Sequence, residues 1–458
     1  MSTESEDAPP RAAIHRFAEP PTVTQRSENP AVASGRLVVA LVVAVVVTIA
    51  ALAAAVGELF AGTQETTAPT TATFGPFTPL VSNDLPPTKL VLAAIFTLTA
   101  VAGCAITFEI IASLMSISPR RRLLGSYRPA RPGTAAEGDV RVTVLVPAHN
   151  EEFSLPVTLG ALREQTRQPD RVIVVADNCT DRTIEIAREM GFEAMESVDN
   201  VHKKGGALNQ ALATLLPGSD ASDVVMIMDA DTSLSQEFIE VAAARLANDP
   251  ELTAVGGVFY GEDGHGLLGQ FQRNEYTRYS LQIRARHGRV FVLTGTASMF
   301  RADALLDVAA ARGVFIPGDT GNVYDTAALT EDNELTLALK SLGATMTSPP
   351  ECMVTTELMP TWRNLWVQRK RWQRGALENL SAYGITRATI RYWGQQIGIG
   401  YGTVALNLAL LLMLITVLAV DDWIWFPFWV AIGGIFVLER VITVWRGGWR
   451  ARLLAAAL

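Results

Sequence analysis

Two aspartates, Asp229 and Asp231, follow the apolar run VVMIM, which is typical of a buried strand. Alternate residues of an extended chain point the same way, so the two carboxylates should lie side by side. No basic residue adjoins them in the sequence, so they would repel each other unless a cation lay between them. Mg²⁺ or Mn²⁺, bound by carboxylates and diphosphate oxygens, fits that arrangement. The alternative is that an aspartate caps a following helix.

Two further groups could meet a nucleotide. Asp177 ends the apolar run RVIVVAD, and a carboxylate in that position can accept hydrogen bonds from a ribose or a base N–H. It is equally compatible with an Asx turn or a helix cap. The run KKGGALN places Lys204 and two glycines at the start of a predicted helix, where backbone N–H groups and an ammonium can bind nucleotide oxygens. An ordinary helix start is the alternative.

A third acidic cluster, Thr330-Glu331-Asp332, begins a predicted helix in the run AALTEDNELTLALKSLG. Thr330 is the expected N-cap, with Asn333 or Glu334 in the first turn. Capping alone would explain these residues, so Asp332 is not diagnostic of catalysis by itself.

The segments that carry these residues alternate between short β-rich runs and helical runs. Strands are predicted at Val140–Val146, Arg171–Val175 and Val224–Met228, and helices at Leu155–Gln165 and Asp181–Met190, the second capped by Thr180 or Asp181. Such alternation predicts a mostly parallel sheet with helices on both faces. Ligands of these folds bind beyond the carboxyl ends of the strands, where the polar runs PAHNEE, ADNCTD and DADT stand in this sequence.

Composition restricts the class of protein. The chain has 458 residues, of which 49% are hydrophobic, and its formal net charge is -8. The negative charge argues against nucleic acid as the main partner. The three cysteines lie far apart without a CxxC pair, so the common zinc spacings and a disulfide framework are excluded. The composition favours a membrane protein with a domain on the reducing, cytoplasmic side.

Four apolar segments are long enough for a bilayer, which needs about 20 residues. They are Leu37–Val56, Leu90–Met115, Ile397–Val420 and Trp423–Trp445. The first has small residues suited to signal cleavage, but it follows a 36-residue tail, so a retained span is predicted. The second contains Glu109, which either faces other helices or marks a shifted membrane boundary.

The distribution of arginine and lysine orients these segments. Arginines occur in the tail 1–36, in 116–138 and in 446–458, whereas the Thr/Pro-rich loop Ala61–Thr88 has no lysine or arginine. By the positive-inside rule both termini and the long middle region are cytoplasmic. The tail is expected to be disordered, and the final LLAAAL suggests the beginning of a further, truncated span.

A run of basic residues and two tryptophans, NLWVQRKRWQRGALENL, precedes the third apolar segment. Arginine and lysine near a membrane are attracted to anionic headgroups, so this run could be only a basic collar. Its meaning depends on the rest of the chain.

Taken together and in order, seven runs resemble the family 2 glycosyltransferases, especially the processive, membrane-embedded synthases of cellulose, chitin, hyaluronan and poly-N-acetylglucosamine. They are PAHNEE, ADNCTD, KKGGALN, DADTS, TGTASMFR, LTEDNEL and QRKRW. The resemblance implies an α/β domain of the Rossmann-like GT-A fold at 139–381, on the cytoplasmic side and flanked by transmembrane helices. The implied order around it is a tail (1–36), a span (37–60), an extracytoplasmic loop (61–89), a span (90–115), a basic linker (116–138), an interfacial helix (382–396), spans (397–420 and 423–445) and a final segment (446–458).

The resemblance also assigns the donor site. Asp177 would hold the uracil or ribose of a UDP-sugar, with Asn150 and Lys204 nearby. Asp229 would complete the nucleotide site, and Asp231 with Asp229 would bind the Mg²⁺ or Mn²⁺ that bridges the diphosphate. A divalent cation stabilises the charge that develops on the leaving diphosphate.

The acceptor site follows in the same way. Asp332 would be the general base that removes the proton from the acceptor hydroxyl, and an aspartate with an ordinary pKa of about 3.9 is already ionised at neutral pH. Glu331 would contact the acceptor, and Gly295 would let the backbone pass close to it, unless Gly295 is merely a turn. The run QRKRW would contribute Gln368 and Arg371 to the diphosphate side and Trp372 to stacking on the acceptor sugar.

The implied activity is inverting transfer, from UDP-N-acetylglucosamine or UDP-glucose in the first place, to the non-reducing end of a growing β-linked polysaccharide that crosses the inner membrane. An accessory membrane subunit is a further expected partner, since only two apolar segments follow the predicted domain. The first alternative is a non-processive transferase that adds one sugar to a lipid carrier or glycolipid. The second is an inactive membrane scaffold, which would leave the intact acidic motifs and QRKRW unexplained.

Overall fold

The computed structural model describes residues 69–73, 80–81, 140–285, 288, 290–419, 424–425 and 427–457. They fall into two compact units. The first contains the described residues of Pro119–Thr389 and Thr443–Leu458, and the second contains those of Thr24–Ser118 and Ile390–Ile442. The predicted tail (1–36), the segments 37–60 and 90–115 and the basic linker 116–138 lie outside the described residues.

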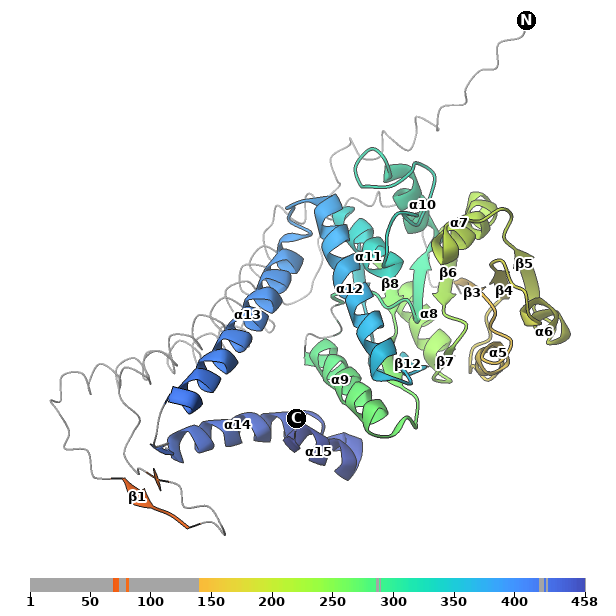
Figure 1. Ribbon diagram of the computed structural model, residues 1–458. Coiled ribbons are helices and arrows are strands. Elements are labelled where there is room, and N and C mark those ends of the chain that lie inside the picture. Colours follow the sequence, from red (N-terminus) through yellow and green to blue (C-terminus); the bar gives the residue numbers. More distant parts are fainter. Residues whose placement is uncertain are drawn as a thin grey trace, which may run out of the picture. The chain divides into compact units, whose positions relative to one another are not determined.

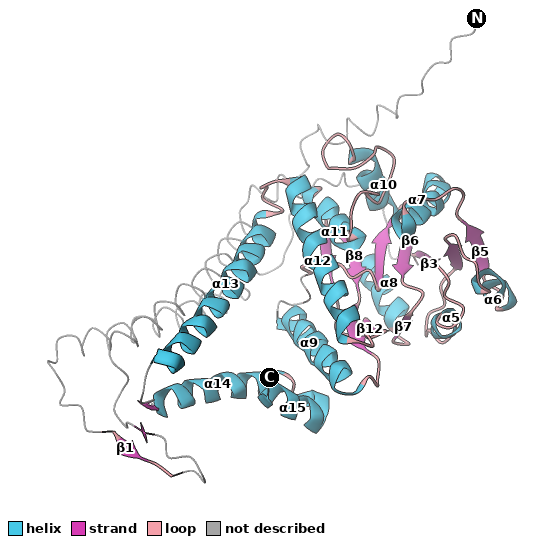
Figure 2. Cartoon of the chain, in the orientation of Figure 1, coloured by secondary structure: helices cyan, strands magenta, loops and turns pink. Residues whose placement is uncertain are grey.

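The first unit is built on a seven-stranded sheet in the order β11-β8-β10-β6-β3-β4-β5. Figure 2 shows the strands of this unit in magenta among its helices. Its strands are β3 (Arg141–Ala148), β4 (Arg171–Ala176), β5 (Glu193–Glu196), β6 (Asp223–Met228), β8 (Leu252–Gly256), β10 (Ala297–Arg301) and β11 (Thr345–Thr347). Only β10 runs antiparallel to its neighbours in this sheet. The predicted mostly parallel sheet is therefore confirmed, and the three strands predicted with bounds, β3, β4 and β6, begin and end within two residues of the predicted positions.

Helices cover both faces of this sheet (Figure 1). One face packs against α5 (Leu155–Arg163), α6 (Thr183–Glu189) and α8 (Phe238–Asn248), and the other against α7 (Lys203–Leu215), α10 (Ala302–Ala311) and α11 (Glu331–Ser341). Successive strand residues point to opposite faces, so Val144 and Val146 join the first core whereas Leu145 joins the second. Burial on both faces explains why these strands are apolar throughout rather than alternating.

A smaller sheet lies beside the first, in the order β7-β12-β9. It consists of β7 (Thr232–Leu234), β9 (Val258–Gly261) and β12 (Met353–Thr356). Because β7 begins one residue after Asp231, neither Asp229 nor Asp231 caps a following helix, and that alternative is wrong.

Three more helices and two short 3₁₀ turns complete the first unit. They are α9 (Gly266–Ala285), α12 (Trp362–Tyr383), α15 (Gly448–Ala457), η1 (Leu216–Gly218) and η2 (Trp445–Gly447). The Nδ2 of Asn274 on α9 donates a hydrogen bond to Ala451 O on α15 at 3.1 Å, so the end of the chain returns to this unit. The run QRKRW lies on α12, in the helix's middle turns.

The second unit contains α13 (Ile390–Ala419), α14 (Pro427–Thr443) and a small sheet of β1 (Thr70–Thr71), β2 (Leu80–Val81) and β13 (Ile424–Trp425). Both helices form where spans were predicted, at 397–420 and 423–445. No helix within the described part of the chain combines the length and the apolar character that a membrane crossing requires. Ile390–Gln396, predicted to end a separate interfacial helix, are instead the first two turns of α13.

Candidate active site

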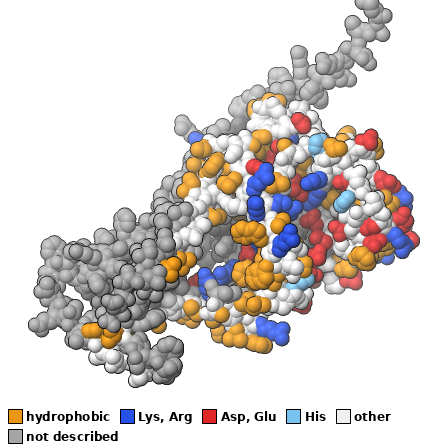
Figure 3. Space-filling model, viewed as in Figure 1, with side chains coloured by type: hydrophobic (Ala, Val, Ile, Leu, Met, Phe, Trp, Pro, Cys, Tyr) orange, Lys and Arg blue, Asp and Glu red, His pale blue; other side chains and the backbone are white. Residues whose placement is uncertain are grey.

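The polar runs gather at the carboxyl ends of the central strands, as the sequence predicted. Parallel β3 and β4 end at Ala148 and Ala176, so Asn150 and Asp177 follow at the same edge of the sheet. The carboxyl end of β6, which is parallel to β3, brings Asp229 to that edge as well. Helices α11 and α12 run beside the central strands (Figure 1), and Figure 3 shows basic side chains close to acidic ones on this face of the molecule.

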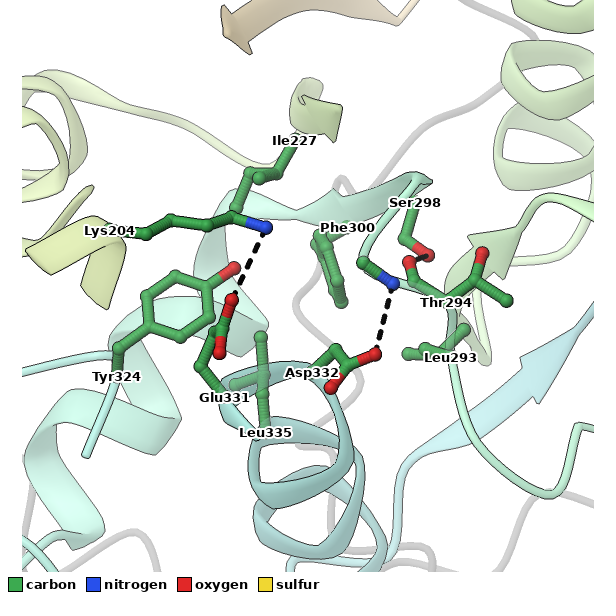
Figure 4. A pocket seen from close by; sticks show the side chains of 11 residues that line it. Lys204, Ile227, Leu293, Thr294, Ser298, Phe300, Tyr324, Glu331, Asp332 and Leu335 are labelled. Atoms are coloured by element: carbon green, nitrogen blue, oxygen red, sulfur yellow. Dashed lines mark hydrogen bonds and ion pairs between the residues drawn. The ribbon is translucent and has the colours of Figure 1, made fainter. Parts of the chain in front are cut away.

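Lys204 is the cation of this cluster. Its Nζ lies 2.6 Å from Asp229 Oδ1 and 3.4 Å from Glu331 Oε1 (Figure 4). Burial by itself would lower the pKa of Lys204, but the two carboxylates more than offset it and raise the pKa above the ordinary value. The inference that the aspartates after β6 have no basic partner was wrong, because the partner lies 25 residues earlier, on another helix.

Asp332 faces this cluster from the first turn of α11. Its Oδ2 accepts a hydrogen bond from Gly295 N at 3.2 Å, and its Oδ1 accepts one from Asn333 N at 2.7 Å. Burial, and then the neighbouring Glu331 carboxylate, raise the pKa of Asp332 to about 6. The expectation of an ordinary pKa is therefore wrong, although a group with a pKa near 6 remains mostly ionised at pH 7.

Gly295 lies directly against Asp332. A Cβ built on it would lie 3.4 Å from Asp332 Oδ2, at van der Waals contact, so a side chain larger than alanine would have to avoid the carboxylate. Its backbone N–H holds that carboxylate in place, which is more specific than the close backbone passage predicted for this glycine.

A small pocket, open to solvent, lies between Lys204 and Asp332. Its lining residues are charged or hydroxylic toward Lys204 and Asp332 and apolar elsewhere: Lys204, Thr294, Gly295, Ser298, Tyr324, Glu331 and Asp332, with Ile227, Leu293, Phe300 and Leu335. Thr294, Ser298 and Tyr324 were not predicted, although the first two lie within TGTASMFR.

Asp231 lies in a strongly acidic environment. Burial, followed by repulsion from Asp229 and Glu151, raises the pKa of Asp231 to about 6, and Thr232 Oγ1 donates to its Oδ1 at 3.2 Å. Within the described ranges no group of three or more His, Cys, Asp or Glu side chains is placed to hold a metal ion. A single carboxylate with excess negative charge around it fits a divalent cation that also binds diphosphate oxygens.

Asp177 is held by three donors on one oxygen. Asn178 Nδ2, Ser197 Oγ and Asn200 Nδ2 lie 3.0, 2.8 and 2.7 Å from its Oδ1. Its side chain is 7% exposed, so burial and these bonds fix its orientation. Every hydrogen bond that the described residues make to its carboxylate reaches Oδ1.

Asn200 joins this carboxylate to the run KKGGALN. Its Nδ2 also donates to Lys203 O at 2.7 Å, and its Oδ1 accepts from His202 N at 3.0 Å. A Cβ on Gly206 would lie 2.1 Å from Asn200 Oδ1, which explains why that position of the run is glycine. Nothing in the sequence pattern singles out Asn200.

The loops around Asp177 contain strained backbone. Asn150, Asn178, Asp199 and Lys203 have φ values of 58°, 49°, 48° and 53°, in the left-handed region that non-glycine residues seldom adopt. Such residues cluster at functional sites. The Oδ1 of Asn150 accepts from Thr180 N at 2.7 Å, so Asn150 ties together the two loops that follow β3 and β4.

Helix α12 packs on the start of α11. The Nδ2 of Asn379 donates to both Thr330 O and Thr330 Oγ1 at 3.2 Å, and a Cβ on Gly375 would lie 2.5 Å from Thr330 Oγ1. Thr330 is the N-cap residue, as predicted, but its side chain makes no capping bond. The residues therefore stand where the capping interpretation placed them, but the side-chain capping bond itself is absent.

The predicted residues of α12 differ in their surroundings. Gln368 Oε1 is buried without a hydrogen-bond partner in the described part of the chain, and Arg371 is exposed. The guanidinium of Arg369, which also pairs with Glu275 at 2.8 Å, lies 4.4 Å from the ring centroid of Trp372. No hydrogen bond or ion pair among the described residues joins Gln368, Arg371 or Trp372 to Lys204 or Asp332, so their predicted roles remain predictions.

The family model described as "Glycosyltransferase like family 2" matches residues 140–375, slightly more than half of the chain. A probable glycosyltransferase of Bacillus subtilis (strain 168), YdaM, is 30% identical over 250 residues, covering 51% of this chain and 55% of that protein. Poly-beta-1,6-N-acetyl-D-glucosamine synthase of Staphylococcus aureus (strain COL) is 26% identical over 246 residues, covering 52% and 55%. This chain thus spans about half the length of these curated relatives.

Among solved structures, the mannosyltransferase PcManGT from Pyrobaculum calidifontis, in complex with GDP-Man and Mn²⁺, is similar in fold. Its TM-score is 0.52 and its sequence identity 19%, and the match covers 80% of this chain and 96% of that one. The likeness, with the family match, confirms the predicted GT-A fold with its mixed α/β sheet.

Proposed function

Because this chain belongs to glycosyltransferase family 2, we propose that it transfers a sugar from a UDP-sugar to a hydroxyl of a growing β-linked polysaccharide, with inversion at the anomeric carbon. The observation that carries this proposal is the pocket in which the Asp332 carboxylate faces the Lys204–Asp229 ion pair. A proton acceptor and a cation on one small pocket are what the transfer of a glycosyl group from a diphosphate requires.

Asp332 is the general base of the proposed reaction. The acceptor oxygen forms a bond to the anomeric carbon while the bond from that carbon to the diphosphate breaks, and the acceptor's proton passes to an Asp332 oxygen. Gly295 N–H and Asn333 N–H keep the carboxylate directed into the pocket. The raised pKa makes Asp332 a stronger base than an ordinary aspartate while it stays mainly ionised at neutral pH.

The departing diphosphate is stabilised by positive charge. Lys204 is shared between Asp229 and Glu331, so its ammonium can also contact a phosphate oxygen that enters between them. Asp231, with the neighbouring Asp229 carboxylate, would hold Mg²⁺ or Mn²⁺, and the ion would supply Lewis-acid stabilisation of the leaving group. Asp177 would receive the uracil or ribose through its Oδ2.

The polymer acceptor is proposed from α12 and from the relatives. The S. aureus relative is named as a poly-beta-1,6-N-acetyl-D-glucosamine synthase, which favours UDP-N-acetylglucosamine as donor. Arg369 occupies one face of the Trp372 ring, and the other face is proposed to stack on the acceptor sugar. Gln368 Oε1, buried without a partner among the described residues, would accept a hydrogen bond from bound substrate.

Membrane attachment is also part of the proposal. Its support is the sequence of Leu37–Val56 and Leu90–Met115 and the distribution of arginines, which would place the catalytic domain and both termini in the cytoplasm at the inner membrane. Fractionation of cells that express the full chain, with alkaline washing of the membranes, tests it. Release of the chain by the wash would contradict an integral membrane location.

The central experiment is transfer by the full chain with Mn²⁺ or Mg²⁺, comparing UDP-N-acetylglucosamine, UDP-glucose and UDP-glucuronate. We expect UDP release and a product that lengthens with time on a gel. A product that gains only one sugar would contradict the polymerase proposal and support transfer to a lipid carrier or glycolipid. No transfer from any of the donors would contradict the proposal as a whole.

A further inference from the structure

Tyr324 lies in the active-site pocket, although no motif of the sequence indicated it. Its side chain is 4% exposed and lines the pocket with Lys204 and Glu331. Figure 4 shows the phenol hydroxyl directed toward these two side chains. None of the hydrogen bonds that the described residues form uses this hydroxyl. A buried hydroxyl that opens into a pocket without a partner is a donor held ready for a ligand.

Asn209 fixes the backbone that carries Tyr324. Its Oδ1 accepts hydrogen bonds from Val323 N at 3.0 Å and from Tyr324 N at 2.8 Å, and its Nδ2 donates to Tyr324 O at 2.9 Å. Asn209 is the last residue of KKGGALN, on α7. The helix that positions Lys204 therefore also positions Tyr324.

Arg312 holds the same segment from the other side. Its Nε donates to Asn322 O at 3.1 Å and to Val323 O at 3.0 Å, while its guanidinium forms a two-point ion pair with Glu334 of α11 at 2.8 and 2.7 Å. Arg312 is fully buried. The segment before Tyr324 is thus tied both to α7 and to the helix that carries Asp332, so the phenol is held rigidly beside them.

Because Tyr324 and Glu331 offer a donor and an acceptor side by side, we propose that they bind one ring hydroxyl of the transferred sugar, a role for Glu331 that replaces the acceptor contact expected from the sequence. The phenol O–H donates a hydrogen bond to the oxygen of that hydroxyl, and the hydroxyl in turn donates a hydrogen bond to the Glu331 carboxylate. A sugar hydroxyl is both donor and acceptor, so this pair satisfies it fully. Burial raises the pKa of Tyr324 above its ordinary value, so the phenol stays protonated as a donor at any working pH. This inference rests on the proposed function and makes Tyr324 a residue that selects the donor sugar.

The test compares UDP-N-acetylglucosamine with its 3-deoxy, 4-deoxy and 6-deoxy analogues, using full-length wild type and Tyr324→Phe. Loss of a hydrogen bond that leaves a buried partner unpaired should lower kcat/KM about 5- to 100-fold. With wild type, we expect one of the three analogues to show this loss of kcat/KM relative to the parent sugar. Tyr324→Phe should show a similar loss with the parent sugar itself. For Tyr324→Phe, replacing the parent sugar by that same analogue should lower kcat/KM by less than about threefold.

Tyr383→Phe is the matched control. Its hydroxyl is also largely buried and donates to Glu334 Oε1 at 2.5 Å, but Tyr383 does not line the pocket. The control should lower thermal stability and leave the pattern of losses with the deoxy sugars as in wild type. If Tyr383→Phe changed the pattern of losses as Tyr324→Phe does, the change would reflect a general loosening of the protein around the pocket. That result would overturn the inference.

Equal penalties for every analogue in wild type and Tyr324→Phe would overturn the role of Tyr324 while leaving the proposed function intact. If Tyr324→Phe does not fold, the kcat/KM values of wild type with the three deoxy sugars still test whether one ring hydroxyl is bound by a hydrogen bond. A wild type that uses all three deoxy sugars within about twofold of the parent makes no such hydrogen bond. Failure of the wild type to transfer any sugar would instead count against the proposed function.

Discussion

Two acidic residues of α11, Asp332 and Glu334, lie two positions apart, but their carboxylates differ in how far neighbouring groups compensate their charge. Glu334 receives both arms of the Arg312 guanidinium, at 2.8 and 2.7 Å, and the hydroxyl of Tyr383, and its side chain is 2% exposed. The Asp332 carboxylate receives two backbone N–H groups, and burial, followed by the Glu331 carboxylate, raises its pKa. One helix therefore carries a fully compensated charge and an under-compensated one.

The difference separates stability from chemistry. A buried carboxylate whose oxygens are already bound by Arg312 and Tyr383 is not free to bind a ligand, so Glu334 serves the fold. A buried carboxylate that is incompletely paired costs stability and retains that affinity, which is what a general base needs. Asp231, whose pKa is likewise raised to about 6, belongs with Asp332 in this respect.

The largest expected effect is loss of activity in Asp332→Asn. Removing a general base should lower kcat about 10²- to 10⁴-fold, because proton transfer to a positioned base typically contributes that factor. UDP affinity, measured by calorimetry, should stay within about threefold of wild type, since Asn keeps the volume and one acceptor oxygen. Retention of most of the activity would show that Asp332 is not the base.

Arg312→Met should cause the largest loss of stability. Removing one partner of a buried ion pair typically costs about 3–5 kcal/mol, because Glu334 would be left charged without compensation. Thermal or urea unfolding of the full chain measures it. The double variant Arg312→Met/Glu334→Leu should recover much of the loss. If the single variant unfolds like wild type, Glu334 is not the compensated charge described above.

Asp231→Asn should act in the opposite direction and stabilise the fold. The folded-state pKa of Asp231 is about 6, above its ordinary value of 3.8, so its ionised form is penalised above pH 6 and the penalty disappears as the pH falls below about 4. With chelator present, we expect the variant to be more stable than wild type by about 1–3 kcal/mol at pH 8 and equal to it at pH 4. Mn²⁺ should raise the unfolding temperature of wild type but not of the variant. A variant less stable than wild type at pH 8 would refute the assignment.

The smallest effect is on the pH dependence of wild type. The pKa of Asp332 is about 6, so kcat/KM should be roughly half-maximal near pH 6 and fall about tenfold per pH unit well below it. Initial rates between pH 4.5 and 8 at saturating Mn²⁺ measure this, with unfolding followed in parallel. An acid limb centred near pH 4 would mean that the pKa of Asp332 is not raised in the working enzyme.

The sequence was most informative where local pattern decides structure. The apolar runs of β3, β4 and β6 predicted a buried, mostly parallel sheet because both of its faces are covered, and the polar runs after them predicted the edge where ligands bind. The motifs indicated Lys204, Asp229, Gly295, Glu331 and Asp332, and the structure brings these five together.

The parts that sequence could not provide depend on long-range pairing. Lys204 neutralises Asp229 across 25 residues, and Arg312 reaches Glu334 across 22, so neither pair is visible as a local pattern. The raised pKa of Asp332 follows from burial, which only the packed structure defines. Thr330 was expected to cap α11 with its side chain, but Asn379 of α12 donates to that hydroxyl instead. Tyr324 lies in a segment without periodicity or a motif.

Gly375 gives enzyme engineers a specific position to alter. A Cβ there would stand 2.5 Å from Thr330 Oγ1 and 2.7 Å from Thr330 Cγ2, so α12 and α11 approach as closely as they do only because position 375 lacks a side chain. Alanine at position 375 would push α12 and α11 apart at this contact. Gly375 is three residues after Trp372, and Thr330 is two residues before Asp332, so the separation would increase close to both side chains. The width available to bulkier acceptors could then be adjusted by one methyl group, without altering any side chain proposed to hold sugar.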